Sequence, residues 1–489
     1  PAWLWLAAWC LLLAVQIITP LWYPTPDACA YLSIARSLAA TARPTNLGDT
    51  YLMFPLGYPS LISPLFLVGG CPFLALTLLH AALSGLYLAG TYVWVRKHAP
   101  EAALPIALLA VGNVLVLGIL RRALSEAAFL PLMIWLVNAL GAIPRSRTVW
   151  RPLLGAGVLL GLLVAVRQAG IFFAAGFGLQ MLLSARRGLL TWRRACGLTL
   201  AVGLPGALAL AGVIGLDHLA ALHQGRWSPL NILFRSSAHL PSDFADRPVG
   251  AQCLEGLRIR ISEVGRLLLP GMFNSYGKDG DWWNLNLLLY LPLVLLVALG
   301  WFRFARQRLD VFALTVPLYV ALYVYWPFNQ SARFFVPLLP MLYLCLWWGL
   351  ERLGQRRRAV LQVLLGAHMV VALGYWLAID RPRALADARR WQDLQQVAAL
   401  VRAEPGTLQT TSELGNSYLL LAYLLDQPVS QQFRGQPVDA RVSWLVDAIE
   451  APPRVGFQPF RTVGPYRLLR RVPVEVSDSP RSPAGVVQE

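Results

Sequence analysis

The sequence predicts an all-α polytopic membrane protein of about eleven transmembrane helices, followed by a small extracytoplasmic α/β domain. Three observations lead to this fold class. Of the 489 residues, 57% are hydrophobic and only 14% are charged, whereas charged residues make up roughly 25% of a soluble domain. The mean hydropathy is positive, at +0.54. Long uncharged runs recur along the chain, and about 20 apolar residues are enough to cross a bilayer as a helix.

Eleven uncharged segments have a length suited to membrane spans. The run at 152–166 is short and requires local bilayer thinning or snorkelling by Arg151. The segments are 1–26, 72–95, 102–120, 127–144, 152–166, 168–185, 195–216, 282–302, 311–332, 334–350 and 359–379.

The formal net charge of +17 follows membrane topology. Sixteen arginines and lysines lie in alternate loops, at 96–97, 145–151, 186–194, 303–308 and 352–358. Cytoplasmic loops are enriched in Lys and Arg, so the N-terminus is expected in the cytoplasm. Treating 152–185 as one span would place most later arginines outside, so that alternative is rejected. The distribution argues against a nucleic-acid-binding surface.

The chain begins with Pro1, so we expect a fragment or a processed product. The first apolar run has no basic n-region and no Ala-x-Ala site, which favours a retained span over a cleaved signal peptide. Cys29 and Cys253 are the two cysteines expected outside the membrane. The spacing does not require a disulfide between them.

Among the carboxylates of the chain, Asp27 is the strongest candidate for a catalytic residue. It follows Pro24 and Pro26 just beyond the first span, in the outer segment 20–71. The spacing of Tyr31, Ile34, Ala35 and Leu38 predicts a short amphipathic helix along the membrane surface. Its dipole would favour the ionised form of Asp27 at the N-terminus. A helix-capping role for Asp27 is the alternative, and the two roles are compatible.

The segment 55–71 is apolar but rich in Pro and Gly, which predicts a broken or re-entrant element. Beyond it, four arginines lie at outer ends of spans, against the charge bias. They are Arg121, Arg122, Arg167 and Arg333. An arginine at this level is costly unless it meets an anion, and a lipid phosphate is the obvious one. The alternatives are a salt bridge to Glu126 or snorkelling to phospholipid.

The outer loop 217–281 contains weaker candidates. Asp279 and Asp281 have the spacing of a carboxylate pair for a divalent ion, although YGKDGDWW is more typical of a turn. No zinc-type spacing occurs, and the loop histidines lack metal-ligand spacing. Trp326, in the later outer turn, could stack on a sugar or belong to an interfacial aromatic belt.

The composition beyond residue 379 is that of a soluble domain, predicted at 380–476, with a disordered tail at 477–489. Within it we predict helices at 387–403 and 416–425, a strand at 408–411, and two or more strands in 454–474. The first 379 residues form the membrane domain.

Four motifs resemble the GT-C superfamily of membrane glycosyltransferases, which includes the lipid A aminoarabinose transferase and the protein O-mannosyltransferases. PDACAYLSIARSL with FPLGYPSLISPLF resembles the first outer loop, and LSEAAFLPLMIWL resembles the Ser-Glu opening of a middle span. GLLVAVRQAGIFF resembles the Arg-centred motif after it. ARFFVPLLP resembles the Arg-aromatic motif that begins a late span.

The resemblance implies a catalytic domain at 1–379 that takes a sugar from a polyprenyl-phosphate donor to a lipid, glycan or protein acceptor outside the cytoplasm. It assigns Asp27 as catalytic base and Glu126 as a second site carboxylate. Arg167 and Arg333, joined by Arg121 and Arg122, are expected to bind the donor phosphate. Expected substrate contacts are Tyr31, Tyr58, Lys278 and Trp326.

The resemblance further implies no nucleotide and no metal, and a location in the bacterial inner membrane. Many relatives have a second acidic residue after the loop Asp, whereas Ala28 follows Asp27 here. This departure argues against metal-dependent chemistry. Two other functions stay open: a transporter or flippase of lipid-linked glycans, and an O-antigen-type polymerase. A transporter should place ionisable residues at mid-membrane, and a polymerase would not need the Asp27 helix.

Overall fold

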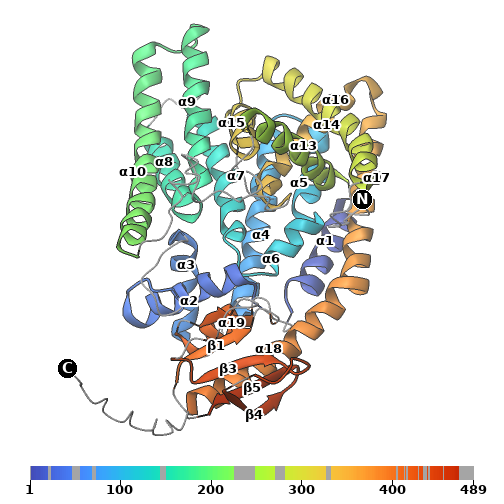
Figure 1. Ribbon diagram of the computed structural model, residues 1–489. Helices are drawn as coiled ribbons and strands as arrows, with labels where there is room; N and C mark the ends of the chain where they lie inside the picture. Colours follow the sequence, from blue (N-terminus) through green and yellow to red (C-terminus); the bar gives the residue numbers. More distant parts are fainter. Residues whose placement is uncertain are drawn as a thin grey trace, which may run out of the picture. The chain divides into compact units, whose positions relative to one another are not determined.

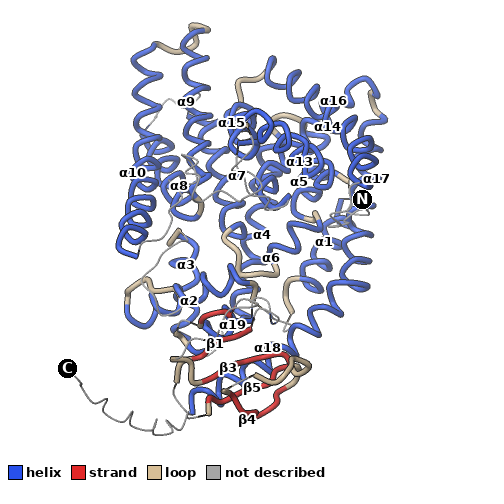
Figure 2. Tube along the Cα trace, viewed as in Figure 1, coloured by secondary structure: helices blue, strands red, loops and turns tan. Residues whose placement is uncertain are grey.

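The computed structural model describes residues 2–19, 24–46, 55–68, 73–143, 150–224, 248–269, 281–325, 332–403, 406–411, 414, 417–427, 429–432, 438, 441–454 and 456–472. The chain divides into two compact units, Pro1–Ala384 and Leu385–Glu489, and each is described by itself. The first is helical, and the second contains all the described strands (Figures 1 and 2).

The first unit is a helical bundle. Its α-helices are α1 (Ala2–Gln16), α2 (Pro26–Thr41), α3 (Gly57–Ile62), α4 (Phe73–Arg96), α5 (Ala103–Val111), α6 (Val114–Leu120), α7 (Glu126–Ala142), α8 (Trp150–Val166), α9 (Ile171–Arg186), α10 (Trp192–Gln224), α13 (Val249–Leu268), α14 (Asp281–Gln307), α15 (Val311–Tyr325), α16 (Leu339–Gly349) and α17 (Arg356–Tyr375). Short 3-10 segments are η1 (Ser63–Val68), η2 (Pro100–Ala102), η4 (Gln168–Gly170), η6 (Ala332–Leu338) and η7 (Leu350–Leu353). A π-helical turn, η8 (Trp376–Asp380), leads into α18 (Arg381–Ala403).

The first unit has the helices of a multi-pass membrane protein. Among the described residues, five helices are long and apolar enough to cross a bilayer, or six when the bent pair α5–α6 is taken as one span. Four more apolar helices of 10–17 residues are shorter than this length. Each of the eleven segments predicted as spans contains a helix. Two features differ from prediction: α10 continues to Gln224 rather than ending at 216, and the amphipathic α13 lies within the predicted outer loop.

Burial distinguishes the centre of the bundle from its perimeter. Among the candidate spans, Ala332–Leu353 is the most enclosed: 83% of its apolar stretch is buried. The corresponding share for Trp192–Gly212 is 22%. Large apolar side chains such as Leu200, Leu204 and Leu208 remain exposed on α10. An exposed apolar face is the expected surface of a helix that meets lipid. Arg333, one of the predicted site residues, is the second residue of this central segment.

A break between α5 and α6 changes the direction of the chain and so sets the orientation of α6. The two helices meet at an angle of 53°, where Gly112 ends α5 and Asn113 caps α6 by accepting a hydrogen bond from Leu115 N at 3.0 Å. The Asn113 amide also donates to Leu267 O at 2.7 Å. The cap thereby ties α6 to the end of α13, and α6 ends at the arginines Arg121 and Arg122.

The second unit is a mixed α/β domain. Its strands are β1 (Leu408–Thr411), β2 (Ser430–Gln432), β3 (Trp444–Ala448), β4 (Phe457–Val463) and β5 (Tyr466–Arg471), in the order β2-β1-β3-β5-β4. β1 pairs in parallel with β2 and β3, while β5 is antiparallel to β3 and β4. The helices are α18 and α19 (Ser417–Leu425), joined by stacking of Trp391 on Tyr423. The strand at 408–411 and both helices were predicted, whereas β2 and β3 were not.

The C-terminal part of β3 holds a buried carboxylate. Asp447 is fully buried and accepts a hydrogen bond from Thr411 at 2.8 Å and from Arg454 Nε at 2.7 Å. A buried carboxylate must be paired to be tolerated. The pairing links β1, β3 and the turn after β3, which accounts for Asp447 as a structural residue.

Candidate active site

Asp27 lies in the first turn of α2. Thr25 caps this helix by accepting a hydrogen bond from Ala28 N at 3.3 Å, and Pro26 occupies the first helical turn, where its missing N–H costs nothing. Asp27 therefore lies at the N-terminal, positive end of the α2 dipole. Residues 28–35 are buried, so the first half of the helix is packed against the bundle while the Asp27 side chain stays 43% exposed.

Glu126 begins α7 and is almost completely enclosed, with 1% of its side chain exposed. Arg167 approaches from the break between α8 and η4, where its backbone is extended, and its Nη1 lies 2.5 Å from Glu126 Oε1. A second arginine, Arg333, donates from Nε and Nη2 to the two Glu126 oxygens. Such a two-point contact is the geometry in which arginine binds a carboxylate best.

Arg333 also binds Asp27, with Nη1 donating to Asp27 Oδ2 at 2.8 Å. One guanidinium thus bridges both predicted carboxylates. We call Asp27, Glu126, Arg167 and Arg333 the charge quartet. Its formal charges cancel. Two arginines direct three N–H groups at the Glu126 oxygens, which leaves this enclosed carboxylate little room to accept a proton from a substrate. Asp27 has one arginine partner and access to solvent, so it is the better proton acceptor of the two.

Tyr31 and Tyr58 lie behind the charge quartet, with exposures of 4% and 0%. The Tyr31 hydroxyl lies 3.1 Å from Ser125 Oγ, which also accepts from Arg167 Nη1 at 3.3 Å. Burial raises the pKa of Tyr31 to about 12, so the hydroxyl stays protonated. Tyr58 contacts the Tyr31 ring edge-on and hydrogen-bonds His80 Nε2 at 2.8 Å. These contacts join α2 to α3 and to the start of α7, and the substrate contact expected for both tyrosines stays a prediction.

Gly57 brings α3 against the end of α8. A Cβ at this position would lie 2.6 Å from the Ala165 carbonyl carbon and 2.7 Å from Val166 N, far inside contact distance. Glycine is required because no side chain fits between the two backbones. The FPLGYP segment thus sets the place of the residue that follows α8, which is Arg167.

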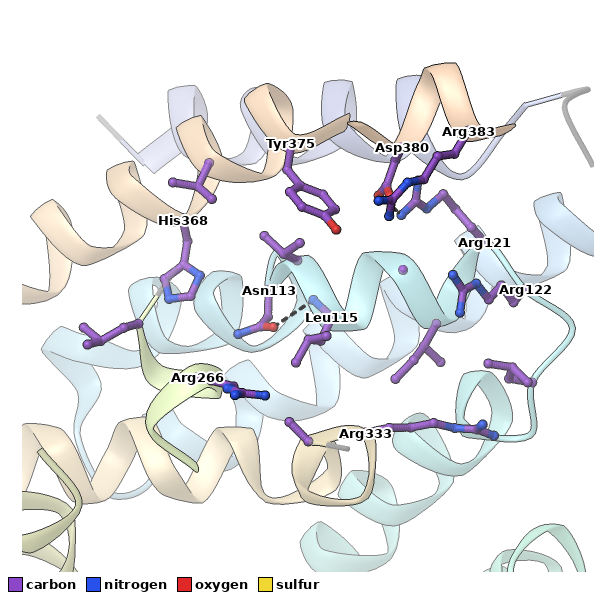
Figure 3. Close-up of a pocket in the computed structure, with 17 residues that line it drawn as sticks. Asn113, Leu115, Arg121, Arg122, Arg266, Arg333, His368, Tyr375, Asp380 and Arg383 are labelled. Carbon is purple, nitrogen blue, oxygen red and sulfur yellow. Dashed lines mark hydrogen bonds and ion pairs between the residues drawn. The ribbon is translucent and has the colours of Figure 1, made fainter. Parts of the chain in front are cut away.

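A cavity of about 290 Å³ adjoins the charge quartet at Arg333, which is one of its lining residues (Figure 3). Tyr375, Asp380 and Arg383 extend into it from one wall, and Arg266 and Arg333 lie on the opposite side. Its lining includes five arginines: Arg121, Arg122, Arg266, Arg333 and Arg383. Asp380 is the one acidic residue of that lining. The cavity therefore favours an anionic ligand.

Arg333 is shared between the cavity and the charge quartet. Of the four arginines predicted to bind phosphate, Arg121, Arg122 and Arg333 line the cavity, whereas Arg167 is held by Glu126 and Ser125 and lies over the Phe334 ring. Arg266 and Arg383 were missed by the sequence reasoning. Both are arginines in segments predicted to be outside, so the charge-bias argument applied to Arg121 would have found them.

Several predicted site residues fall outside the described part of the chain. They are Lys278, Asp279 and Trp326, together with the side chain of Asp281. Within the described residues, no three His, Cys, Asp or Glu side chains form a group that could hold a metal ion. Cys29 and Cys253, considered as a disulfide pair, are both free thiols.

Comparison with known proteins identifies the fold. No family model and no curated protein sequence matches the chain. ArnT from Cupriavidus metallidurans bound to undecaprenyl phosphate superposes with a TM-score of 0.62 at 12% identity, over 96% of this chain and 98% of ArnT. Apo ArnT gives 0.58 at 12% identity, over 96% and 97% of the two chains.

A second group of similar structures is archaeal. The Archaeoglobus fulgidus oligosaccharyltransferase in complex with Zn and sulfate matches with a TM-score of 0.55 at 14% identity, over 91% of this chain and 68% of that one. The same organism's AglB with an inhibitory peptide and a dolichol-phosphate gives 0.53 at 14% identity, over 91% and 69%. The resemblance seen in the sequence motifs is confirmed for the fold: this chain has the fold of the GT-C membrane glycosyltransferases.

Proposed function

We propose that the protein is a membrane glycosyltransferase that moves a sugar from a polyprenyl-phosphate donor to a hydroxyl group of a lipid, glycan or protein on the extracytoplasmic face. The observation that carries this proposal is the double contact of Arg333. This residue lines the arginine-rich cavity and also binds Asp27 at 2.8 Å. An anion in the cavity and a base at Asp27 would therefore lie on two sides of one guanidinium.

The chemistry requires a base near the acceptor and fixed positive charge near the leaving group. Asp27 would accept the proton of the acceptor hydroxyl, whose oxygen attacks the anomeric carbon of the sugar. The bond from that carbon to the phosphate oxygen breaks, and the phosphate leaves with the electron pair. Arg333 and the other cavity arginines would stabilise that charge. A single displacement gives inversion at the anomeric carbon.

Glu126 takes a different role from the second catalytic carboxylate that the motifs imply. Its two oxygens are occupied by Arg333 and Arg167, and its side chain is 1% exposed. We assign it to positioning: it fixes the plane of the Arg333 guanidinium, so that one edge is available to Asp27 and the cavity.

The topology is part of the proposal. The eleven helical segments would span the membrane with the N-terminus in the cytoplasm of a bacterial inner membrane, which places Asp27 and the cavity outside. The catalytic membrane domain would cover residues 1–379. Residues 380–476 would form an extracytoplasmic domain, with 477–489 as a tail outside the described part of the chain.

The test is transfer of labelled sugar from a panel of synthetic polyprenyl-phosphate sugars to cell-envelope acceptors, with the protein in nanodiscs. Wild type should consume one donor. Asp27→Asn should lower kcat by about 10²- to 10⁴-fold, the usual contribution of a general base, while binding of polyprenyl phosphate is retained. Arg333→Ala should lose both transfer and binding. Asp387→Asn, a partly exposed carboxylate that pairs with Arg390 in α18, is the matched control and should be unchanged.

A transporter or flippase of lipid-linked glycans is the competing function, since an arginine-lined cavity would also suit a lipid phosphate in transit. It has no use for a base at Asp27. Full transfer activity in Asp27→Asn would remove the base assignment. If no donor is consumed, flipping of the same lipids in proteoliposomes becomes the decisive assay.

A further inference from the structure

The wall of the cavity contains an ion pair that the transfer reaction does not require. Arg121 Nη2 bonds Asp380 Oδ2, and the two side chains are 14% and 17% exposed. The Arg121 guanidinium also lies over the Trp376 ring, 4.7 Å from its centroid. Trp376 and Asp380 are the two ends of the π-helical turn η8. The turn thus presents a ring and a carboxylate to the same arginine.

The π-helical turn η8 is a rare type of element, and it lies between two helices that line the cavity. π-helical turns within longer helices are rare and cluster at functional sites. Here the turn joins α17, which contributes His368 and Tyr375 to the cavity, to α18, which contributes Arg383. A carboxylate at position 380 opposes the anion preference of a cavity that is otherwise lined by five arginines.

Asp380 binds only part of the Arg121 guanidinium. Arg121 Nε is buried and has no hydrogen-bond partner among the described residues, while its Nη2 is bound to Asp380. An arginine presents five N–H donors in a fixed fork. An incoming phosphate could therefore take Asp380's place on Arg121, or share the guanidinium with it. In either case the phosphate and the carboxylate would repel each other.

We propose that Asp380 is an internal competitor for the phosphate group and that it acts to release the product. This inference rests on the proposed transferase function. The donor is a phosphodiester with one negative charge. After the bond to the sugar breaks, the product is a phosphomonoester with a charge of about −1.5 to −2 at pH 7. Because repulsion scales with the product of the charges, Asp380 weakens binding of the product more than binding of the donor.

The experiment compares two probes that differ in this charge and otherwise by a single methyl group: undecaprenyl phosphate and its methyl ester, a phosphodiester. Binding of each is measured by competition with radiolabelled undecaprenyl phosphate, using the full chain in nanodiscs. Asp380→Asn should bind the monoester about tenfold tighter and the diester about threefold tighter, since the repulsion removed is larger for the more highly charged ligand. Asp380→Glu keeps the charge and should match wild type. Asp387→Asn is the matched control.

Two further measurements separate this role from a structural one. In an Arg121→Ala background the ion pair is gone but the charge of Asp380 remains. Asp380→Asn should then still favour the monoester over the diester, whereas an Asp380 that served only to hold Arg121 would have no effect on either ligand. In steady-state transfer, Asp380→Asn should lower KM and kcat together and show stronger inhibition by undecaprenyl phosphate. If Asp380→Asn does not stay monodisperse on size exclusion, Asp380→Ser serves in its place.

Unchanged or weaker monoester binding in Asp380→Asn would overturn the proposal, as would equal gains for both probes. In those cases wild-type binding of undecaprenyl phosphate leaves the donor assignment intact. If neither wild type nor any variant binds either probe, the proposed function itself fails, and the role of Asp380 falls with it.

Discussion

At the residue scale, Glu126 is the most constrained group of the charge quartet. A carboxylate with 1% exposure beside two arginines is tolerated because both partners compensate its burial. The motif implies a second site carboxylate, and the role that we propose for Glu126 is to support Arg333 and Arg167.

Replacing Glu126 by Gln leaves two arginines facing a neutral amide. We expect a loss of about 3 kcal/mol in stability, because breaking a buried ion pair strands charge in a poorly solvated place. Thermal unfolding in detergent measures it. Glu101→Gln, in the exposed pair with Arg357, is the control and should cost less than about 1 kcal/mol. Equal effects for the two variants would contradict the assigned support role.

Arg333 also bears on metal dependence. Its guanidinium lies between Asp27 and Glu126, so the positive charge there is already supplied by the chain. We expect transfer activity to be unchanged, within about twofold, after EDTA treatment, because a divalent ion would have to displace a paired arginine. The measurement is the initial rate before and after chelation. A loss that added Mn²⁺ or Mg²⁺ restores would show that the carboxylates hold a metal.

At the element scale, α2, α3, α7, the α8–η4 break and η6 converge on one point although they are far apart in the sequence. Each contributes one feature. The α2 cap presents Asp27, the start of α7 presents Glu126, and the break after α8 presents Arg167. The glycine at position 57 controls how closely α3 approaches that break.

Gly57→Ala should therefore reduce transfer without unfolding the protein. The added methyl would lie 2.6 Å from the Ala165 carbonyl carbon, and relief requires the end of α8 to move and carry Arg167 with it. Overpacking of this kind costs about 1–3 kcal/mol. We expect at least about tenfold lower kcat, since misplacement by an ångström is costly in catalysis.

The matched control is Gly85→Ala in α4, where an added Cβ meets nothing within 4 Å. It should retain activity and gain up to about 1 kcal/mol from better helix propensity. Comparable losses in both variants would indicate a general sensitivity to mutation and contradict the specific role of Gly57.

At the scale of the whole molecule, the proposed topology places Asp27 and the basic loops on opposite faces. Cysteine labelling in a background without native cysteines tests it. Ala40→Cys, in an exposed position of α2, should react with a membrane-impermeant maleimide in intact spheroplasts. Leu189→Cys, 68% exposed in a loop with four nearby arginines, should react only after permeabilisation. The reverse pattern would invert the topology and place the cavity inside.

The membrane character and the helical segments followed from the sequence alone, because apolar runs and basic loops are local properties. The α2 helix could be predicted for the same reason, from the spacing of its apolar residues. The capping role considered for Asp27 was wrong, because Thr25 caps the helix and Asp27 lies in its first turn. The short strands β2 and β3 could not be predicted. They are 3 and 5 residues long, and what makes them strands is pairing with β1 across the chain.

For the candidate site, too, some features follow from local sequence and others only from tertiary packing. Arg167 and Arg333 were predicted from the cost of placing charge near a membrane, and Asp27 and Glu126 from their places in the sequence motifs, all of which the sequence displays residue by residue. Which carboxylate pairs with which arginine, and that one guanidinium bridges both, was decided only by the tertiary structure. The cavity and its opposing carboxylate Asp380 were likewise invisible in the sequence, because their walls come from α6, α13, η6 and α17, and a cavity exists only where distant segments pack and leave space.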